Sequence, residues 1–199
     1  MIRCYIGIGS NLGDRHHNIQ GAVRNIMMLA HTRVRKLSTI ITSLPQGGPA
    51  GQGPYLNAAL EIDTQLTPYQ LLQELQRIES GFGRVRTVKD APRIIDLDIL
   101  TYGDITMNEE ALCIPHPRIL ERDFVLLPLR EIAPDEVLEL IQRSKEPRKQ
   151  RKKTLRPLIK KAKTKKKEQR NGKRGKPALK SKPKNKAKIK AKIKAKKRS

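Results

Sequence analysis

This sequence of 199 residues is poor in aromatic side chains, with no tryptophan, two phenylalanines and four tyrosines. Sheets that bind single-stranded RNA stack bases on aromatic rings, so this scarcity weighs against such a protein. Cysteine is scarce as well, because Cys4 and Cys113 are the only two and match no metal-binding spacing. Two isolated cysteines are typical of reduced thiols, and we expect a cytoplasmic protein.

Long hydrophobic runs are missing too. No apolar stretch approaches the ~20 residues of a membrane span, and the N-terminus lacks the features of a signal peptide, so we expect no membrane association. No Gly-x-x-x-x-Gly-Lys-Ser/Thr loop is present, and Leu12 stands where a Gly-x-Gly-x-x-Gly fingerprint starting at Gly7 needs its third glycine. If this chain binds ATP, it does so through arginines and metals.

Charge divides the chain into two regions. Residues 1–143 contain 15 Lys+Arg and 17 Asp+Glu, whereas residues 144–199 contain 28 and 2, which together give the net charge of +24. We therefore expect a globular domain over 1–143 and, over 144–199, a Lys-rich disordered tail that cannot bury enough apolar surface to fold. Such polycations bind nucleic acid or another polyanion by neutralising phosphates, and the alternative is a passive solubility tail.

The most informative segment is Ala91–Leu100, in which Asp96 and Asp98 interrupt an apolar, strand-like run. Successive side chains on a strand point to opposite faces, so the two aspartates share one face while Leu97 and Ile99 pack behind. Adjacent carboxylates repel, and a hard cation such as Mg²⁺ between them relieves the repulsion. The alternative is a solvated polar face on an edge strand.

Three arginines near this pair favour the metal hypothesis. Arg93 lies three residues before Asp96, and Arg84 and Arg86 follow Gly83. The planar guanidinium suits phosphate oxygens. Carboxylates for a metal and arginines for phosphate together indicate nucleotide chemistry.

Periodicity and capping residues predict the order strand, helix, strand, strand, helix, strand, which favours an α+β, ferredoxin-like arrangement. A long Gly/Pro-rich loop, of a kind that is usually functional, separates the second and third strands. A later hairpin and a last helix follow the Asp-x-Asp strand. The expected elements are strands at Ile2–Ile8, Val34–Thr42 and Tyr55–Thr64; helices at Arg15–Leu29 after Asp14, from Pro68 to about Gly81 after Thr67, and from about Asp123; the loop 45–54; and a hairpin through Gly103-Asp104 to Leu112–Ile114.

Two further segments carry polar groups that fit a nucleotide or heterocycle. His116 lies between two prolines in a loop that continues to Arg122 and Phe124. Such an imidazole can contact a phosphate, although a lone histidine is more frequently structural. Tyr55 and Asn57 share a strand face, and the amide can pair with a heterocycle edge or simply satisfy backbone groups.

Together these segments resemble one family, the 6-hydroxymethyl-7,8-dihydropterin pyrophosphokinases of folate biosynthesis. The similarity runs in the family's order from residue 1 to about 136. The matching segments are Gly9–Asp14, Gly51–Ala59, Leu75–Glu79, Gly83–Arg86, Ala91–Leu100, Ile114–Phe124 and Pro128–Pro134.

The resemblance implies a ferredoxin-like α/β/α sandwich with a mainly antiparallel sheet. It implies transfer of the pyrophosphoryl unit of ATP to the hydroxymethyl group of the pterin, with two Mg²⁺ ions on Asp96 and Asp98. We expect the protein to be a monomer. The implied catalytic residues are Arg84, Arg93, Asp96 and Asp98; the ATP-binding residues are Gln76, Glu79, Arg86, Ile99, His116 and Arg122; and the pterin-binding residues are Ser43, Leu44, Pro45, Tyr55, Asn57 and Phe124.

The chain departs from the family pattern at three places. Residues 87–90 lack the aromatic side chain that covers the pterin, and Gln46 stands where an apolar residue is usual. After Pro134, a short stretch from Glu136 to Gln142 leads directly into the basic region. Two alternative functions are an RNA-binding protein, against which the negative Asp96 and Asp98 argue, and an inactive enzyme domain, against which the retained site residues argue.

Overall fold

The computed structural model describes residues 1–84 and 91–145. Four strands form an antiparallel sheet in the order β2-β4-β1-β5, and a short fifth strand, β3, pairs with β4. This is the strand order of a ferredoxin-like fold, as the sequence predicts. The strands span β1 (Ile2–Ser10), β2 (Thr32–Leu37), β3 (Ile41–Ser43), β4 (Tyr55–Thr64) and β5 (Asp96–Tyr102).

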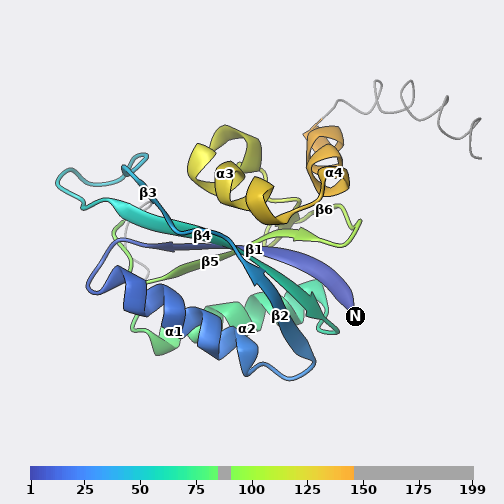
Figure 1. The fold of residues 1–199 in the computed structure, drawn as a ribbon, viewed down its shortest axis with the longest axis horizontal. Coiled ribbons are helices and arrows are strands. Elements are labelled where there is room, and N and C mark those ends of the chain that lie inside the picture. Colours follow the sequence, from blue (N-terminus) through green and yellow to red (C-terminus); the bar gives the residue numbers. More distant parts are fainter. Residues whose placement is uncertain (85–90, 146–199) are drawn as a thin grey trace, which may run out of the picture. The chain divides into compact units, whose positions relative to one another are not determined.

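Helices cover both faces of this sheet (Figure 1). The helices α1 (Arg15–Met27) and α2 (Pro68–Gly81) lie on one face, and α3 (Asp123–Ile132) and α4 (Asp135–Lys145) lie on the other. The predicted α/β/α sandwich is therefore confirmed. Among the described helices, none is long and apolar enough to cross a membrane.

The alternation of side chains along the strands divides the interior into two cores. On β1, Cys4, Ile6 and Ile8 face the core shared with α1 and α2. Tyr5 points the other way, into the core beneath α3 and α4. The same alternation puts Leu97 of β5 into the first core and Leu100 into the second, so each strand supplies both layers.

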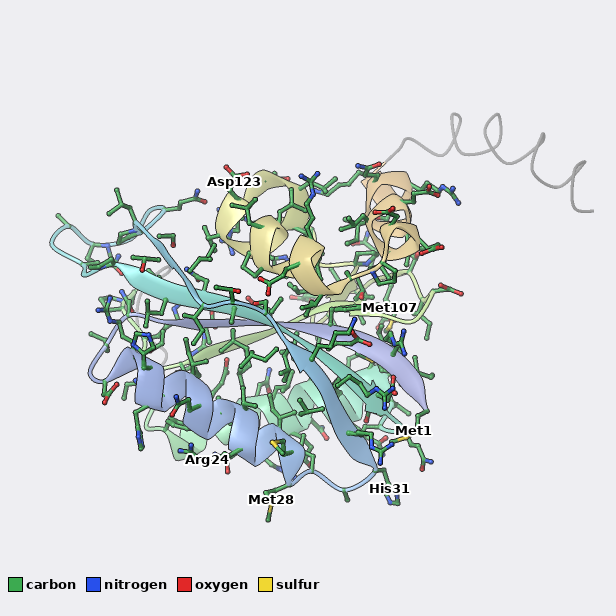
Figure 2. All side chains as sticks on the ribbon, in the orientation of Figure 1. Met1, Arg24, Met28, His31, Met107 and Asp123 are labelled. Atoms are coloured by element: carbon green, nitrogen blue, oxygen red, sulfur yellow. The ribbon has the colours of Figure 1, made fainter. Side chains whose placement is uncertain are left out.

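The two helices of the first layer begin where their capping residues predict. Asp14 accepts a hydrogen bond from the backbone N–H of His17 at 3.0 Å. Thr67 and Gln70 form a reciprocal capping box ahead of α2, with Pro68 in its first turn. Met27, the last residue of α1, is 59% exposed, because it lies about 100° around the helix from the buried Ile26. Figure 2 shows the neighbouring Met28 pointing outward from the end of this helix.

The predicted strand Val34–Thr42 is wrong in one respect, because it is two strands separated by Ser38–Ile40. Ser38 still pairs with β4: its backbone N–H donates to the Ala59 carbonyl and its hydroxyl accepts from the Ala59 N–H, both at 2.9 Å. The next N–H, that of Thr39, turns out of the sheet and donates to Glu131 of α3. This side-chain partner ends β2.

The chain after β5 also differs from prediction. The expected hairpin through Gly103 forms one step later, between β6 (Met107–Asn108) and β7 (Cys113–Ile114), because Glu109 and Leu112 exchange backbone hydrogen bonds there. After the 3-10 turn Ile119–Glu121 and α3, helix α4 runs to Lys145, past the predicted domain end at 143. Buried Ile141 and the ion pair of Lys145 with Glu121 hold this last turn. The predicted disordered tail otherwise lies outside the described residues.

Candidate active site

Asp96 and Asp98 share one face of the sheet, as strand alternation predicts, and this face is the one that α3 covers. Asp96 and Asp98 of β5 face β1 at the register positions of Gly9 and Gly7. A Cβ atom added at Gly9 would lie 3.4 Å from the Asn57 Oδ1 atom and 3.9 Å from the Asp96 Cβ atom. Gly9 therefore leaves the floor beside Asp96 open.

Two predicted arginines bind the first carboxylate directly. Arg84 Nη2 lies 2.7 Å from Asp96 Oδ1, and Arg93 Nη1 lies 2.8 Å from Asp96 Oδ2. The Arg84 guanidinium also pairs with Glu79. Each oxygen of Asp96 thus has an arginine partner. Asp96, Arg84 and Arg93 form one cluster of paired charges at the start of β5.

Unlike Asp96, Asp98 makes no ion pair within 4.0 Å among the described residues. Burial raises its pKa to about 7, with the negative charges of Asp96 and Glu79 adding to the shift and Arg84 and Arg122 opposing it. Such a site favours a bound cation, which would replace the proton. No cluster of three or more His, Cys, Asp or Glu suited to a metal occurs in the described part of the chain. The two carboxylates of Asp96 and Asp98 suit Mg²⁺, which takes one or two carboxylates and completes its shell with phosphate oxygens and water.

Two adjoining hollows lie over these groups. The first encloses about 510 Å³, open solvent included, and is lined by Ser43, Leu44, Tyr55, Asn57 and Phe124, five of the six predicted pterin residues. The second, of about 420 Å³, is lined by Asp96, Asp98, His116 and Arg122 among others. Gly9, Asn57, Asp96, Arg122 and Phe124 line both, so the two hollows form one cleft.

Arg122 and His116 form the far wall of this cleft. The Arg122 guanidinium lies 5.6 Å above the Phe124 ring, at the start of α3. Burial, together with the nearby Arg122 and Arg118, lowers the pKa of His116 to about 4, so the imidazole is neutral at pH 7. Its Nδ1 atom accepts from the Arg118 N–H at 3.2 Å. The ring proton is therefore assigned to Nε2, which is left to donate.

Three predicted ATP residues have different surroundings. Glu79 is 3% exposed, and its carboxylate accepts from the Leu97 N–H at 2.7 Å and from Arg84. Gln76 lies one turn earlier on α2 and is partly exposed. The Ile99 side chain is 3% exposed in the core behind the aspartates. Their contacts with a nucleotide remain predictions.

Two predicted site residues remain, and the structure describes one of them. Pro45 follows Leu44 in the glycine-rich loop and is partly buried. Arg86 lies outside the described residues, as does the predicted gap in aromatic cover at 87–90.

The sequence did not predict a link between the loop 45–54 and the segment that contains Arg93. Asn11, 6% exposed, accepts from the Arg93 N–H at 2.8 Å and donates to Gln52 Oε1 at 3.2 Å. Gln52 in turn donates to the carbonyls of Gly47 and Pro49. The backbone of Arg93 is thus tied to the loop 45–54. The only sequence signal was the position of Asn11 after a glycine-rich turn.

The fold and the site define an α+β protein of ferredoxin-like topology whose sheet carries a carboxylate pair flanked by arginines. Comparison with known families assigns it more narrowly. Residues 5–134 match the family described as 7,8-dihydro-6-hydroxymethylpterin-pyrophosphokinase, or HPPK. The chain belongs to this family, which confirms the resemblance stated above.

Individual relatives agree with this assignment. The chain is 44% identical over 138 residues to the 2-amino-4-hydroxy-6-hydroxymethyldihydropteridine pyrophosphokinase of Methylorubrum extorquens, covering 69% of this chain and 87% of the relative. It is likewise 44% identical over 138 residues to the enzyme of the same name from Haemophilus influenzae, covering 69% and 86%.

Solved structures support the fold. Plasmodium falciparum HPPK-DHPS, at 13% identity, has a TM-score of 0.50 over 68% of this chain and 40% of the solved chain. A second HPPK-DHPS structure, solved with substrates, has a TM-score of 0.51 at 14% identity, covering 67% and 40%. The chain therefore spans about two fifths of those longer proteins, and this similarity concerns the fold alone.

Proposed function

We propose that this protein transfers the β,γ-pyrophosphoryl unit of ATP to the hydroxymethyl oxygen of 6-hydroxymethyl-7,8-dihydropterin in folate biosynthesis. The observation that carries the proposal is the cleft itself: its two hollows share Asp96, Asn57 and Arg122, so phosphate-binding and heterocycle-binding groups adjoin. The names of the relatives that are 44% identical support the same reaction.

The chemistry is a single displacement. The hydroxymethyl oxygen forms a bond to the β-phosphorus, and the bond between that phosphorus and the oxygen bridging to the α-phosphate breaks. AMP leaves with the bond's electron pair, and the hydroxyl proton is released. Phosphoryl transfer of this kind depends mainly on positioning and charge stabilisation.

The carboxylates of Asp96 and Asp98 would hold two Mg²⁺ ions against the triphosphate. The bound metal would neutralise the phosphate oxygens and orient them for in-line attack. Arg84 and Arg93, which now bind Asp96, are placed to share their donors with phosphate oxygens. Arg86 is proposed as a third phosphate-binding arginine on the basis of its sequence position.

On the far wall, the Nε2–H of neutral His116 would donate to the nucleotide phosphates, and Arg122 would add a positive charge. Gln76, Glu79 and the Ile99 backbone are proposed for the nucleoside side. The charge cluster thus surrounds the position where negative charge develops.

The pterin would occupy the first hollow. Asn57 donates to the Ser43 hydroxyl at 2.9 Å and is 5% exposed, so its amide is fixed in one orientation. An oriented amide and hydroxyl select a heterocycle edge, and the rings of Phe124 and Tyr55 supply apolar faces. Leu44 and Pro45 complete the proposed pocket from the loop side.

The metal requirement is tested by measuring AMP formation while Mg²⁺ is titrated into protein freed of metal with a chelator. A cooperative rise, with stoichiometric binding of two ions in the presence of an unreactive ATP analogue, is expected. Full activity in excess chelator would contradict the metal assignment to Asp96 and Asp98.

The basic residues 144–199 support a second, separable activity. Their 28 Lys+Arg against 2 Asp+Glu would bind nucleic acid or another polyanion in a salt-dependent manner. We place the protein in the cytoplasm as a monomer; its two cysteines are free, which suits a reducing compartment.

A further inference from the structure

Glu131 makes a long-range contact that the proposed function does not use. Both carboxylate oxygens accept from the backbone N–H of Thr39, at 3.0 and 2.9 Å, and Oε1 also accepts from the Thr39 hydroxyl at 3.0 Å. The two residues are 92 positions apart in the sequence. We call this contact the Glu131–Thr39 clamp.

The position of Glu131 on its own helix does not explain it. Glu131 lies in the last turn of α3, where the helix dipole disfavours a negative side chain. Its side chain is exposed and belongs to neither core. Instead, the Glu131 carboxylate accepts a hydrogen bond from the Thr39 N–H, which points out of the sheet at the break between β2 and β3.

The clamp joins two segments that both reach the pterin hollow, and we call them arms. The first arm is α3, and the second is the chain from Thr39 to Ser43. Along α3, Phe124 precedes Glu131 by seven residues, which is two helical turns or ~10 Å, so the two lie on one side of the helix. Along the other arm, Ser43 follows Thr39 by four residues and is the last residue of β3. Phe124 and Ser43 both line the first hollow.

The second arm depends on an anchor. Strand β3 has three residues and is paired only with β4 in the described sheet, through Ile41, Thr42 and Ser43. Helix α3 packs across β4 and touches β3 (Figure 1). Among the described residues, the Glu131–Thr39 clamp is the charge-assisted hydrogen bond that joins α3 to the start of this arm.

We infer that Glu131 is a positioning residue that sets the width of the pterin pocket by joining α3 to the start of β3. It holds Ser43 and Leu44 at the distance from Phe124 that fits the flat heterocycle. This inference rests on the proposed function, because it concerns the pterin end of the same cleft. At the ATP end, Asp98 lies on β5 and His116 lies in the loop after β7, outside both arms.

The test compares Glu131→Ala and Glu131→Gln with Glu139→Ala, which removes an exposed glutamate paired only within α4, to Arg143. For Glu131→Ala we expect the KM for the pterin to rise about tenfold, while kcat and the KM for ATP change by less than about twofold. The Glu131→Gln value should lie between, because one amide oxygen can still accept from Thr39. Amide hydrogen exchange at Thr39 should accelerate in Glu131→Ala and not in Glu139→Ala.

Each other outcome counts against the inference. Faster exchange at Thr39 with an unchanged KM for the pterin would mean that the clamp exists but does not shape the pocket. An equal rise in the KM for ATP would indicate general loosening. If the wild-type chain forms AMP from ATP but not in response to the pterin, the proposed function fails and this inference fails with it; wild-type activity separates the two cases.

Discussion

Asp98 is the residue on which the site depends most. Its carboxylate has a pKa raised to about 7 in the folded protein, above its ordinary value of 3.8. The stability that goes with a raised pKa is present at low pH and is lost as the pH rises through 7. An ionised Asp98 therefore destabilises the metal-free fold, and a bound cation would remove that cost.

Replacing this carboxylate should separate activity from stability. We expect Asp98→Asn to lower kcat by about a thousandfold, because the proposed metal ligand is lost. The same variant should melt at a higher temperature than wild type at pH 8 in chelator, with the difference shrinking at pH 5. Asp104→Asn, at an exposed aspartate, is the control. A near-normal kcat, or a lower melting temperature at pH 8, would contradict the assignment.

His116 makes a second prediction at the scale of one residue. Because its folded pKa is lowered to about 4 from 6.5, the imidazole should stay neutral in an NMR titration of the ligand-free protein until well below pH 6. Its contribution to stability is present above pH 6.5 and is lost as the pH falls toward 4. The resonance is identified by its loss in His116→Gln. Protonation near pH 6.5 would refute the neutral donor proposed for this ring.

At the scale of elements, the packing of α1 against α2 depends on one glycine. A Cβ atom added at Gly21 would lie 2.8 Å from the Phe82 Cζ atom, at the end of α2. Gly21→Ala should therefore lower the free energy of unfolding by ~1–3 kcal/mol despite the better helix propensity of alanine. Gly81→Ala is the matched control, since a Cβ there meets nothing within 4 Å. Urea unfolding measures both, and equal stability of the two variants would show that Phe82 moves aside.

Elements bounded by local signals were predictable from the sequence. Strand β4 has its predicted limits because a Gly/Pro loop precedes Tyr55 and the capping residue Thr67 follows it closely. The break between β2 and β3 was not predictable, because Thr39 leaves the sheet for a partner 92 residues away. The alternation of side chains along a strand does not indicate a hydrogen-bond partner that is distant in the sequence.

In the site, too, local patterns were predictable from the sequence and long-range contacts were not. The shared face of Asp96 and Asp98 follows from the two-residue period of a strand, and five of the six predicted pterin residues line one hollow. The link from Asn11 to Gln52 and Arg93 was missed, because it joins three loops through side-chain amides. The partner of Glu79 is likewise a backbone N–H of β5, which sequence spacing does not reveal.

At the scale of the whole molecule, the charge division predicts two independent activities. A chain cut after Pro147 keeps the compact unit Met1–Pro147 and the contacts of Lys145 with Glu121 and the Pro117 carbonyl. Its pterin-dependent rate should equal that of the full chain within about twofold, while retention on immobilised nucleic acid at low salt is lost. A large loss of activity would instead assign residues 148–199 to the site.

We propose that this cleft transfers the pyrophosphoryl unit from ATP to the pterin as one piece. The most direct measurement follows ³¹P NMR of Mg-ATP with the purified chain, with and without 6-hydroxymethyl-7,8-dihydropterin. We expect AMP and a pterin diphosphate in equal amounts, formed only when the pterin is present. Formation of ADP, or AMP that appears at the same rate without the pterin, would contradict it.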